Sequence, residues 1–332
     1  MAPAESAEPA TRDRPGRVLL LGASGTIGEA TARALVAAGH EVLAPLRHQP
    51  GRTLDAWSRR LPGVQWRWCD VAEPGAVAAC LAEAGPVRAV ISCLASRNGV
   101  ATDAAAIDHR AHRQALQAAQ AAGVPQFVLL SAICLQRPRL AFQHAKLAFE
   151  AELQASPLDW VIVRPTAYFK SLSGQVERVR RGGAFRVFGD GTGTACRPIG
   201  DDDLAAYLVD CLDDPARQRR ILPIGGPGPA LTPLDQARLL AELTGQPLRL
   251  RSVPLSLLDR IATTLDRLAR LTPPRWRPAV EARAEYARIG RYYASESMLV
   301  WDEASGRYRE DLTPATGTVT LADHYRQLLA QA

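Results

Sequence analysis

The sequence of 332 residues has few cysteines, no long apolar run and no block of like charge. No stretch approaches the roughly 18 apolar residues of a membrane span, so we expect a soluble protein with at most peripheral membrane contact. The six cysteines are far apart and form neither a C-x-x-C pair nor a His/Cys cluster at metal-ligand spacing. We therefore expect no metal site, whether zinc or iron–sulfur, and a reducing compartment with buried thiols.

Basic residues exceed acidic ones only slightly: 40 Lys+Arg against 34 Asp+Glu give a net charge of +6. Arginines are spread along the whole chain, so the charge does not indicate a nucleic-acid partner. Residues 1–16 are rich in Ala, Pro and Glu, lack the apolar core of a signal peptide, and carry acids that a transit peptide avoids. We expect a disordered tail over 1–16 and a bacterial, cytoplasmic protein.

From residue 17 onward, short apolar runs alternate with amphipathic stretches, which is typical of a parallel sheet wrapped by helices. A long Ala- and Gln-rich helix over about 103–122 is predicted to connect the fourth strand to the fifth. Such connections are right-handed, so the pattern predicts an α/β fold with a Rossmann-type doubly wound parallel sheet. The six predicted strands cover 17–23, 41–47, 64–70, 87–95, 126–132 and 158–165.

The alternation ends after Pro165, where mixed helices, short strands and proline-rich turns follow. We therefore divide the chain into an NADP-binding Rossmann domain over 17–165 and a smaller substrate-covering region over 166–332. The second region is expected to pack on the same sheet, at the carboxyl ends of its strands.

The loop after the first strand carries glycines in the pattern G-x-x-G-x-x-G. Glycine allows a tight turn and the close approach of backbone to a pyrophosphate, and the helix that follows offers unpaired N–H groups. The loop lies between a strand and a helix at the start of a repeated βα pattern, which is the context that dinucleotide binding requires. We predict cofactor contacts from Gly22, Ser24, Gly25, Thr26, Ile27 and Gly28.

The end of the second strand favours NADPH over NADH. An NAD enzyme usually has Asp or Glu there, whereas this chain has Arg47 and His48, which attract a ribose 2′-phosphate. A solvated surface arginine is the alternative, because arginine is common in this sequence. Asp70, at the end of the third strand, is predicted to meet the adenine amino group; a plain turn-forming aspartate is the alternative.

The fourth and fifth strands supply the nicotinamide end of the predicted site. The fourth ends in small residues, so we expect the cofactor riboses to lie against Cys93, Leu94 and Ala95. Ser131, at the end of the fifth strand, stands where short-chain dehydrogenase/reductases have their serine. On the next helix Lys146 is predicted to bind the nicotinamide ribose and to lower nearby pKa values, with an exposed helix lysine as the alternative.

Residues 142–150, FQHAKLAFE, resemble the Tyr-x-x-x-Lys helix of short-chain dehydrogenase/reductases, but Phe142 replaces the tyrosine. Phe142 lies one helical turn before Lys146 on the same face. Reduction of a ketone requires an acid that protonates the developing alkoxide, and phenylalanine has no such proton. Either the protein binds a dinucleotide without turnover, or its acceptor is not a carbonyl.

Residues 255–274 form an amphipathic stretch in which arginines are interleaved with apolar residues at helical spacing. Such a helix can rest on a membrane surface. We favour the alternative, in which it packs as a lid or wall on the reductase domain. The apolar positions are Leu258, Ile261, Leu265 and Leu268, and the basic ones are Arg260, Arg267 and Arg270.

Seven segments carry a family resemblance: ISCLASRNGV, AIDHRAHRQAL, RLAFQHAKLAFEAEL, RPTAYFKSLSGQVERVRRG, VFGDGTGTACRPI, RILPIGGPGPALTP and GRYYASESMLVWD. They closely resemble the NADPH-dependent divinyl chlorophyllide a 8-vinyl reductases, from Gly16 to the end of the chain. The resemblance implies an atypical, isoflavone-reductase-like short-chain reductase that reduces the C8 vinyl group of this tetrapyrrole to ethyl in chlorophyll and bacteriochlorophyll synthesis. The missing plant transit peptide then points to a bacterial phototroph, with peripheral contact at its photosynthetic membrane left open.

The implied reaction suggests why Phe142 is tolerated. Hydride addition to the terminal vinyl carbon would place negative charge on the neighbouring carbon, where the macrocycle and its Mg²⁺ take it up. No alkoxide forms, so a tyrosine acid is not needed and the remaining task is positioning. For the slower proton delivery we consider Lys146, Tyr168 and His144, in that order, with Lys146 and Tyr168 as the catalytic residues.

The same resemblance suggests substrate contacts at an apolar wall and after the sixth strand. Lys170 or Arg164 is expected to pair with the propionate carboxylate of the pigment. Two other functions remain open: a non-catalytic NADP(H)-binding sensor or scaffold, and a reductase of a different alkene or ether. The predicted substrate-binding residues are Phe142, Tyr168, Phe169 and Lys170.

Overall fold

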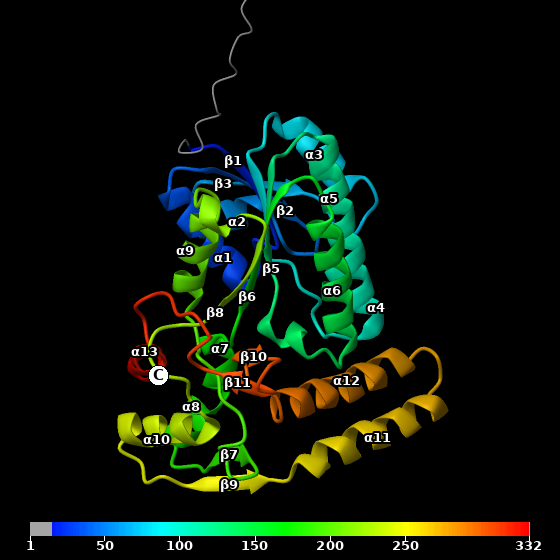
Figure 1. Ribbon diagram of the computed structural model, residues 1–332. Helices are drawn as coiled ribbons and strands as arrows, with labels where there is room; N and C mark the ends of the chain where they lie inside the picture. The colour runs from blue at the N-terminus through cyan, green and yellow to red at the C-terminus, as the bar shows by residue number, and fades with distance from the viewer. Residues whose placement is uncertain (1–14, 332) are drawn as a thin grey trace, which may run out of the picture.

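The computed structural model of the chain describes residues 15–331. All of the predicted tail except Pro15 and Gly16 therefore lies outside the described residues. The described chain is built around a main sheet with helices on both faces, and a smaller region lies beyond the carboxyl ends of that sheet's strands (Figure 1).

Seven strands form the parallel sheet, in the order β3-β2-β1-β4-β5-β6-β8. All six strands expected from the sequence are present, which confirms the doubly wound α/β fold. The seventh, β8, was not expected, because its run RILPI is short, contains a proline and is largely accessible at the sheet edge. The strands are β1 Arg17–Leu21, β2 Glu41–Leu46, β3 Val64–Trp68, β4 Ala89–Ser92, β5 Gln126–Leu130, β6 Asp159–Pro165 and β8 Arg220–Ile224.

The side chains of β1 alternate between the two faces of the sheet. Val18 and Leu20 pack in one apolar cluster, and Leu19 and Leu21 pack in the other. All four are fully buried, so each contributes about 1.5–3 kcal/mol to the stability of the fold. The first cluster is covered by α1 (Thr26–Ala37), α2 (Leu54–Arg60) and α9 (Asp201–Asp210), and the second by α3 (Ala76–Ala84), α5 (His112–Ala121) and α6 (Ala141–Gln154).

The crossover between β4 and β5 is not one regular helix. It begins with α4 (Ala101–Ala104), continues as a π-helical segment, η1 (Ala105–Ala111), and ends with α5. The prediction of a regular helix over about 103–122 was therefore wrong in its middle. A π-helical turn inserts extra backbone into a helix and redirects the side chains at that point, which is why such turns are frequent at functional sites.

The smaller region contains a separate apolar cluster around Phe169, Val179, Leu240 and Tyr325. A helical hairpin, α11 (Leu255–Leu271) and α12 (Arg277–Tyr293), projects from it (Figure 1). No helix in residues 15–331 combines the length and apolarity that crossing a bilayer requires. The region's other elements are α7 Phe169–Leu172, η3 Ser173–Gln175, α8 Val176–Arg180, β7 Phe185–Phe188, α10 Pro233–Thr244, β9 Leu250–Val253, β10 Val300–Asp302, β11 Arg307–Arg309 and α13 Leu321–Ala330.

Candidate active site

The glycine loop between β1 and α1 is packed so closely that two of its positions admit only glycine. Gly22 has φ of +78°, and a Cβ there would lie 2.8 Å from the carbonyl carbon and oxygen of Cys93. A Cβ on Gly28 would lie 2.1 Å from the carbonyl oxygen of Gly22. Ser24, Gly25 and Thr26 remain exposed, so the loop presents its backbone at the start of α1. This is a cradle that fits a diphosphate.

A cavity of about 540 Å³ lies beside this loop, at the carboxyl ends of β1 to β4. Three guanidinium groups reach it, from Arg47, Arg52 and Arg97, whereas the sequence indicated only the first. Asp70 also lines the cavity, while its Oδ1 accepts a hydrogen bond of 3.0 Å from the Ala72 N–H. Of the predicted cofactor residues, those that line the cavity are Gly22, Ser24, Gly25, Arg47, Asp70, Cys93, Leu94 and Ala95.

Three other loop residues have supporting positions. Ile27 is buried in the core, Gly28 packs on Gly22, and Thr26 stands exposed at the first position of α1. His48 does not line the cavity; its ring packs against Trp68 at a centroid distance of 4.9 Å.

Lys146 forms a buried ion pair with Asp108. The Lys146 Nζ lies 3.0 Å from Asp108 Oδ1, and the side chains are 11% and 0% exposed. Asp108 belongs to the π-helical segment η1, whose Ile107 lines the nucleotide cavity. Its Oδ1 also accepts a 3.1 Å hydrogen bond from the Ser96 N–H, and its Oδ2 has no partner within the described residues. The ammonium group is therefore fixed by a residue whose neighbour, Ile107, lines the nucleotide cavity, although Lys146 itself does not line it. The alternative of an exposed helix lysine is wrong, because the Lys146 side chain is buried.

His112 lies one turn beyond Asp108 and is fully buried. Its Nδ1 is 2.8 Å from the Ile107 carbonyl oxygen, which can only accept, so Nε2 accepts from the Ser92 hydroxyl at 2.9 Å. Burial lowers the pKa of His112 to about 4, and the Lys146 ammonium adds to that lowering. The ring is therefore neutral near pH 7 and supports the helix turn that carries Asp108.

Ser131 is hydrogen-bonded away from both cavities. Its hydroxyl donates to the buried carboxylate of Glu150, which also pairs with Arg164. Ser131 lines neither the nucleotide cavity nor the apolar cavity described next. Because Arg164 already has a buried carboxylate partner, it is not free to bind the carboxylate of a ligand. The cofactor contact expected of Ser131 stays a prediction.

A second cavity, of about 520 Å³ and mostly apolar lining, opens between the sheet and the smaller region. Tyr168, directly after β6, and Tyr293, at the end of α12, both line it. Burial raises the pKa of Tyr168, and the neighbouring thiols Cys93 and Cys134 add to the rise. Tyr168 lines the apolar cavity and Cys93 lines the nucleotide cavity, and both side chains pack against the apolar cluster on one face of the sheet.

Tyr293 is a candidate functional residue that the sequence analysis missed. Its hydroxyl donates to Cys134 Sγ at 3.7 Å, and burial raises its pKa well above the usual range, with Cys134 adding to the rise. Burial also raises the pKa of Cys134, while the Lys146 ammonium opposes that rise. Tyr293 therefore contacts the Cys134 thiol, and both line the apolar cavity together with Tyr168.

Phe142 is half-buried and packs with Ile289 of α12 in one apolar cluster. Gly99 reaches the same point: a Cβ there would lie 3.4 Å from the Phe142 ring and 2.8 Å from Ile289 Cδ1. The base of the α11–α12 hairpin thus closes over the helix that carries Lys146. His144, on the same helix, is exposed.

Of the four predicted substrate residues only Tyr168 lines the apolar cavity; Phe142, Phe169 and Lys170 do not. Phe169 is buried in the cluster of the smaller region. Lys170 is exposed, and its Nζ donates to the Thr26 hydroxyl at 2.9 Å, at the first residue of α1. Their contacts with substrate stay predictions.

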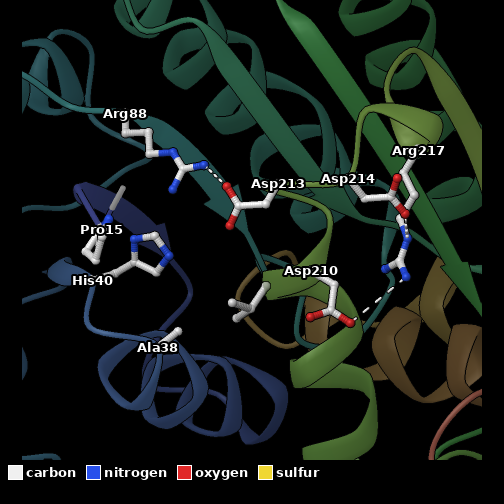
Figure 2. A pocket seen from close by; sticks show the side chains of 9 residues that line it. Pro15, Ala38, His40, Arg88, Asp210, Asp213, Asp214 and Arg217 are labelled. Carbon is white, nitrogen blue, oxygen red and sulfur yellow. Dashed lines mark hydrogen bonds and ion pairs between the residues drawn. The ribbon is translucent and has the colours of Figure 1, made fainter. Parts of the chain in front are cut away.

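A third cavity, of about 510 Å³, lies at the amino ends of the strands, opposite the other two cavities (Figure 2). Its walls come from residues that precede β2, β4 and β8, and it holds the ion pairs Arg88–Asp213 and Arg217–Asp214. Ligands of doubly wound folds bind at the carboxyl ends of the strands. This polar cavity lies at their amino ends, so we do not assign it to cofactor or substrate binding.

Comparison with known proteins identifies the chain's relatives. Residues 22–215 match the family model described as NAD(P)H-binding. The divinyl chlorophyllide a 8-vinyl-reductase of Oryza sativa subsp. indica is 44% identical over 323 residues, covering 95% of this chain and 78% of that protein. The corresponding protein of Arabidopsis thaliana is 41% identical over 325 residues, covering 95% and 77%. The chain belongs to the divinyl chlorophyllide a 8-vinyl-reductase family.

This membership confirms the family resemblance, NAD(P)H binding and the oxidoreductase class expected from the sequence. Among solved structures, an NADPH-dependent quinone oxidoreductase of Escherichia coli has a TM-score of 0.67 at 17% identity, covering 94% of this chain and 99% of that one. At this identity the likeness supports the fold alone.

The expected location was wrong. The rice and Arabidopsis members of the family are chloroplastic plant proteins, which contradicts a bacterial, cytoplasmic assignment. That expectation depended on the composition of the opening residues, whereas the similarity extends over 95% of the chain.

Proposed function

We propose that this member of the family uses NADPH to reduce the C8 vinyl group of divinyl chlorophyllide a to an ethyl group, the activity for which its relatives are named. One observation carries the proposal: Asp108 holds Lys146 in a buried ion pair, Ile107 of the same π-helical segment lines the nucleotide cavity, and Phe142 stands at the position of the usual acid. This arrangement has a cofactor-orienting cation and no dedicated carbonyl acid.

The cavity beside the glycine loop fits a dinucleotide. Gly22 and Gly28 leave space that any Cβ would fill, and the start of α1 faces that space. Arg47, with Arg52 and Arg97 in the same cavity, supports NADPH over NADH, because guanidinium groups bind a 2′-phosphate bidentately. When bound, NADPH supplies the hydride for the reduction.

The protein's own residues position the substrate and supply a proton. The Lys146 ammonium, held by Asp108, binds the ribose hydroxyls and adds positive potential near the reacting carbon. Phe142 and Ile289 form an apolar wall that keeps water from this point. The phenols of Tyr168 and Tyr293 stay protonated near pH 7 because burial raises their pKa values. Either can donate the proton that completes the ethyl group.

Residues 17–165 and 166–332 are proposed to divide these tasks. The first segment would bind the cofactor and the second would cover the pigment. The division is not absolute: β8, from the second segment, is the seventh strand of the sheet, and α9, from the same segment, covers one of its faces. The apolar cavity is lined from both segments, by Ala132 to Cys134 on one side and by residues such as Phe185 and Met298 on the other.

We also propose peripheral contact with an anionic lipid surface through the outer face of α11. Leu257, Ile261, Leu268 and Leu271 are exposed and follow one face of the helix. Residues 255–293 contain eight arginines but four acidic residues. An exposed apolar stripe beside arginines suits an anionic bilayer surface. The test is co-sedimentation with anionic and neutral vesicles: the unmodified chain should prefer the anionic ones, and Leu268→Ser with Leu271→Ser should weaken its binding to them, because the apolar stripe is lost.

The reductase proposal is tested by anaerobic incubation of the protein with divinyl chlorophyllide a and either NADPH or NADH, followed by pigment chromatography. We expect the 8-ethyl product with NADPH and far less with NADH. Tyr168→Phe, Tyr293→Phe and the double variant then identify the proton donor. Tight NADPH binding without any product would favour the sensor or scaffold function, or a different alkene substrate.

A further inference from the structure

Lysine is almost absent from this protein. Of its 40 basic residues, only Lys146 and Lys170 are lysines; the other 38 are arginines. The chain thus uses arginine for its surface cations and for almost all of its ion pairs. One of the two exceptions, Lys146, lies in the buried pair at the cofactor site. Lys170 is the other lysine, and a merely solvated cation at its position could equally be an arginine, so the position should have a role that requires lysine.

Lys170 lies at the start of α1, although it comes from α7, after β6. Its Nζ donates to Thr26 Oγ1 at 2.9 Å, between the second and third glycines of the motif. Phe169, the preceding residue, is 3% exposed and fixes the segment in the apolar cluster of the smaller region. The hydrogen bond to Thr26 and the burial of Phe169 together hold the Lys170 ammonium at the loop.

This is an unfavourable place for a cation unless an anion is also present. The first turn of a helix carries partial positive charge and unpaired N–H groups, so a lysine there is repelled. No salt bridge joins Lys170 to a carboxylate among residues 15–331. The acidic group that responds to it is Asp201 of α9: burial raises the pKa of Asp201, and the Lys170 ammonium opposes that rise. The position suits a lysine whose partner is a bound anion.

We infer that Lys170 binds the diphosphate of the dinucleotide cofactor and not a carboxylate of the reduced substrate. An ammonium group has three donors, so it can keep the Thr26 hydroxyl and still reach two phosphate oxygens. The inference rests on the dinucleotide-binding part of the proposed function and is independent of the pigment.

The contact has a consequence for the apolar cavity. Tyr168, Ser171 and Leu172, on either side of Lys170, all line that cavity. A lysine that binds the diphosphate therefore ties one wall of the apolar cavity to the bound cofactor.

The test is calorimetric titration of the full chain with NADPH, NADP⁺, 2′-phospho-ADP-ribose and 2′-AMP, at low and high salt. Lys170→Ala should weaken the three diphosphate ligands by about 10- to 100-fold, the usual effect of losing a hydrogen bond to a charged group. It should leave 2′-AMP, which has no diphosphate, unchanged. Lys170→Arg should restore only part of the affinity, and the salt dependence of NADPH binding should fall in Lys170→Ala.

Two variants complete the design. Thr26→Val keeps the lysine but removes its hydroxyl partner, and should weaken the same three ligands by a smaller factor. Arg181→Ala removes an exposed cation that pairs with Glu177 on α8 and should change no affinity.

Unchanged NADPH affinity in Lys170→Ala, together with a raised KM for the pigment, would overturn the inference in favour of a substrate carboxylate. Equal weakening of 2′-AMP would overturn it as well, because the effect would not depend on the diphosphate. A chain that binds its cofactor as expected but leaves the vinyl group intact would remove the proposed function and leave this inference standing.

Discussion

Removing one partner of the Lys146–Asp108 pair should strongly destabilise the protein, because it leaves the other partner as an unpaired buried charge. Lys146→Ala leaves the Asp108 carboxylate with a single hydrogen bond, from the Ser96 N–H at 3.1 Å, in a site where its side chain is 0% exposed. Removing one member of a buried pair costs about 3–5 kcal/mol. A typical domain has about 5–15 kcal/mol of stability, so the loss should be easily measured.

The assay is guanidinium unfolding followed by circular dichroism, without cofactor. Lys146→Ala should shift the midpoint to lower denaturant with an unchanged slope. The double variant Lys146→Ala with Asp108→Ala should lose less than the sum of the single losses, since it leaves no unpaired buried charge. As a control, Arg181→Ala breaks an exposed pair and should not move the midpoint.

A midpoint for Lys146→Ala equal to that of the unmodified chain would refute this reasoning. It would mean that Asp108 is solvated or protonated in the folded protein, so that no charge is stranded when Lys146 is removed. Strict additivity of the two single losses would have the same meaning, because it would show that the two side chains do not interact.

Three further perturbations have defined outcomes. Phe142→Tyr should leave vinyl reduction largely intact, because no alkoxide needs an acid there; complete inactivation of the folded variant, measured by pigment chromatography, would contradict this role. Arg47→Ala should raise the KM for NADPH by roughly 10-fold and leave the KM for NADH unchanged, as steady-state kinetics would show. His112 has its pKa lowered from 6.5 to about 4, so the unfolded chain binds a proton that the folded chain does not. Stability should therefore fall by up to about 3 kcal/mol as pH drops from 6.5 to 4, and His112→Gln should flatten that dependence in unfolding experiments.

The sheet and the nucleotide loop could be predicted because their signals are local. Apolar runs such as 126–132 are bounded by turns, and the trio ending at Gly28 lies between a strand and a helix. The seventh strand, Arg220–Ile224, gave no comparable signal, because an accessible edge strand needs no continuous apolar run.

The site residues that were missed depend on distant parts of the chain or on an irregular helix. Asp108 meets Lys146 from the π-helical segment η1, and an alanine-rich run without Gly or Pro gives no sign of such a turn. Tyr293 reaches the site from α12, whose path across the apolar cavity cannot be derived from periodicity. Lys170 was correctly placed at the strand ends, but its contact with Thr26 required the fold of the smaller region.

The most direct test of the central claim follows hydrogen from the cofactor into the pigment. NADPH carrying deuterium at both positions of nicotinamide C4 is incubated anaerobically with divinyl chlorophyllide a and the protein, and the product is analysed by mass spectrometry and NMR. We predict one deuterium per molecule, on the terminal carbon of the new 8-ethyl group, with the second hydrogen from solvent. An 8-ethyl product without deuterium, or no product from protein that binds NADPH, would contradict the account.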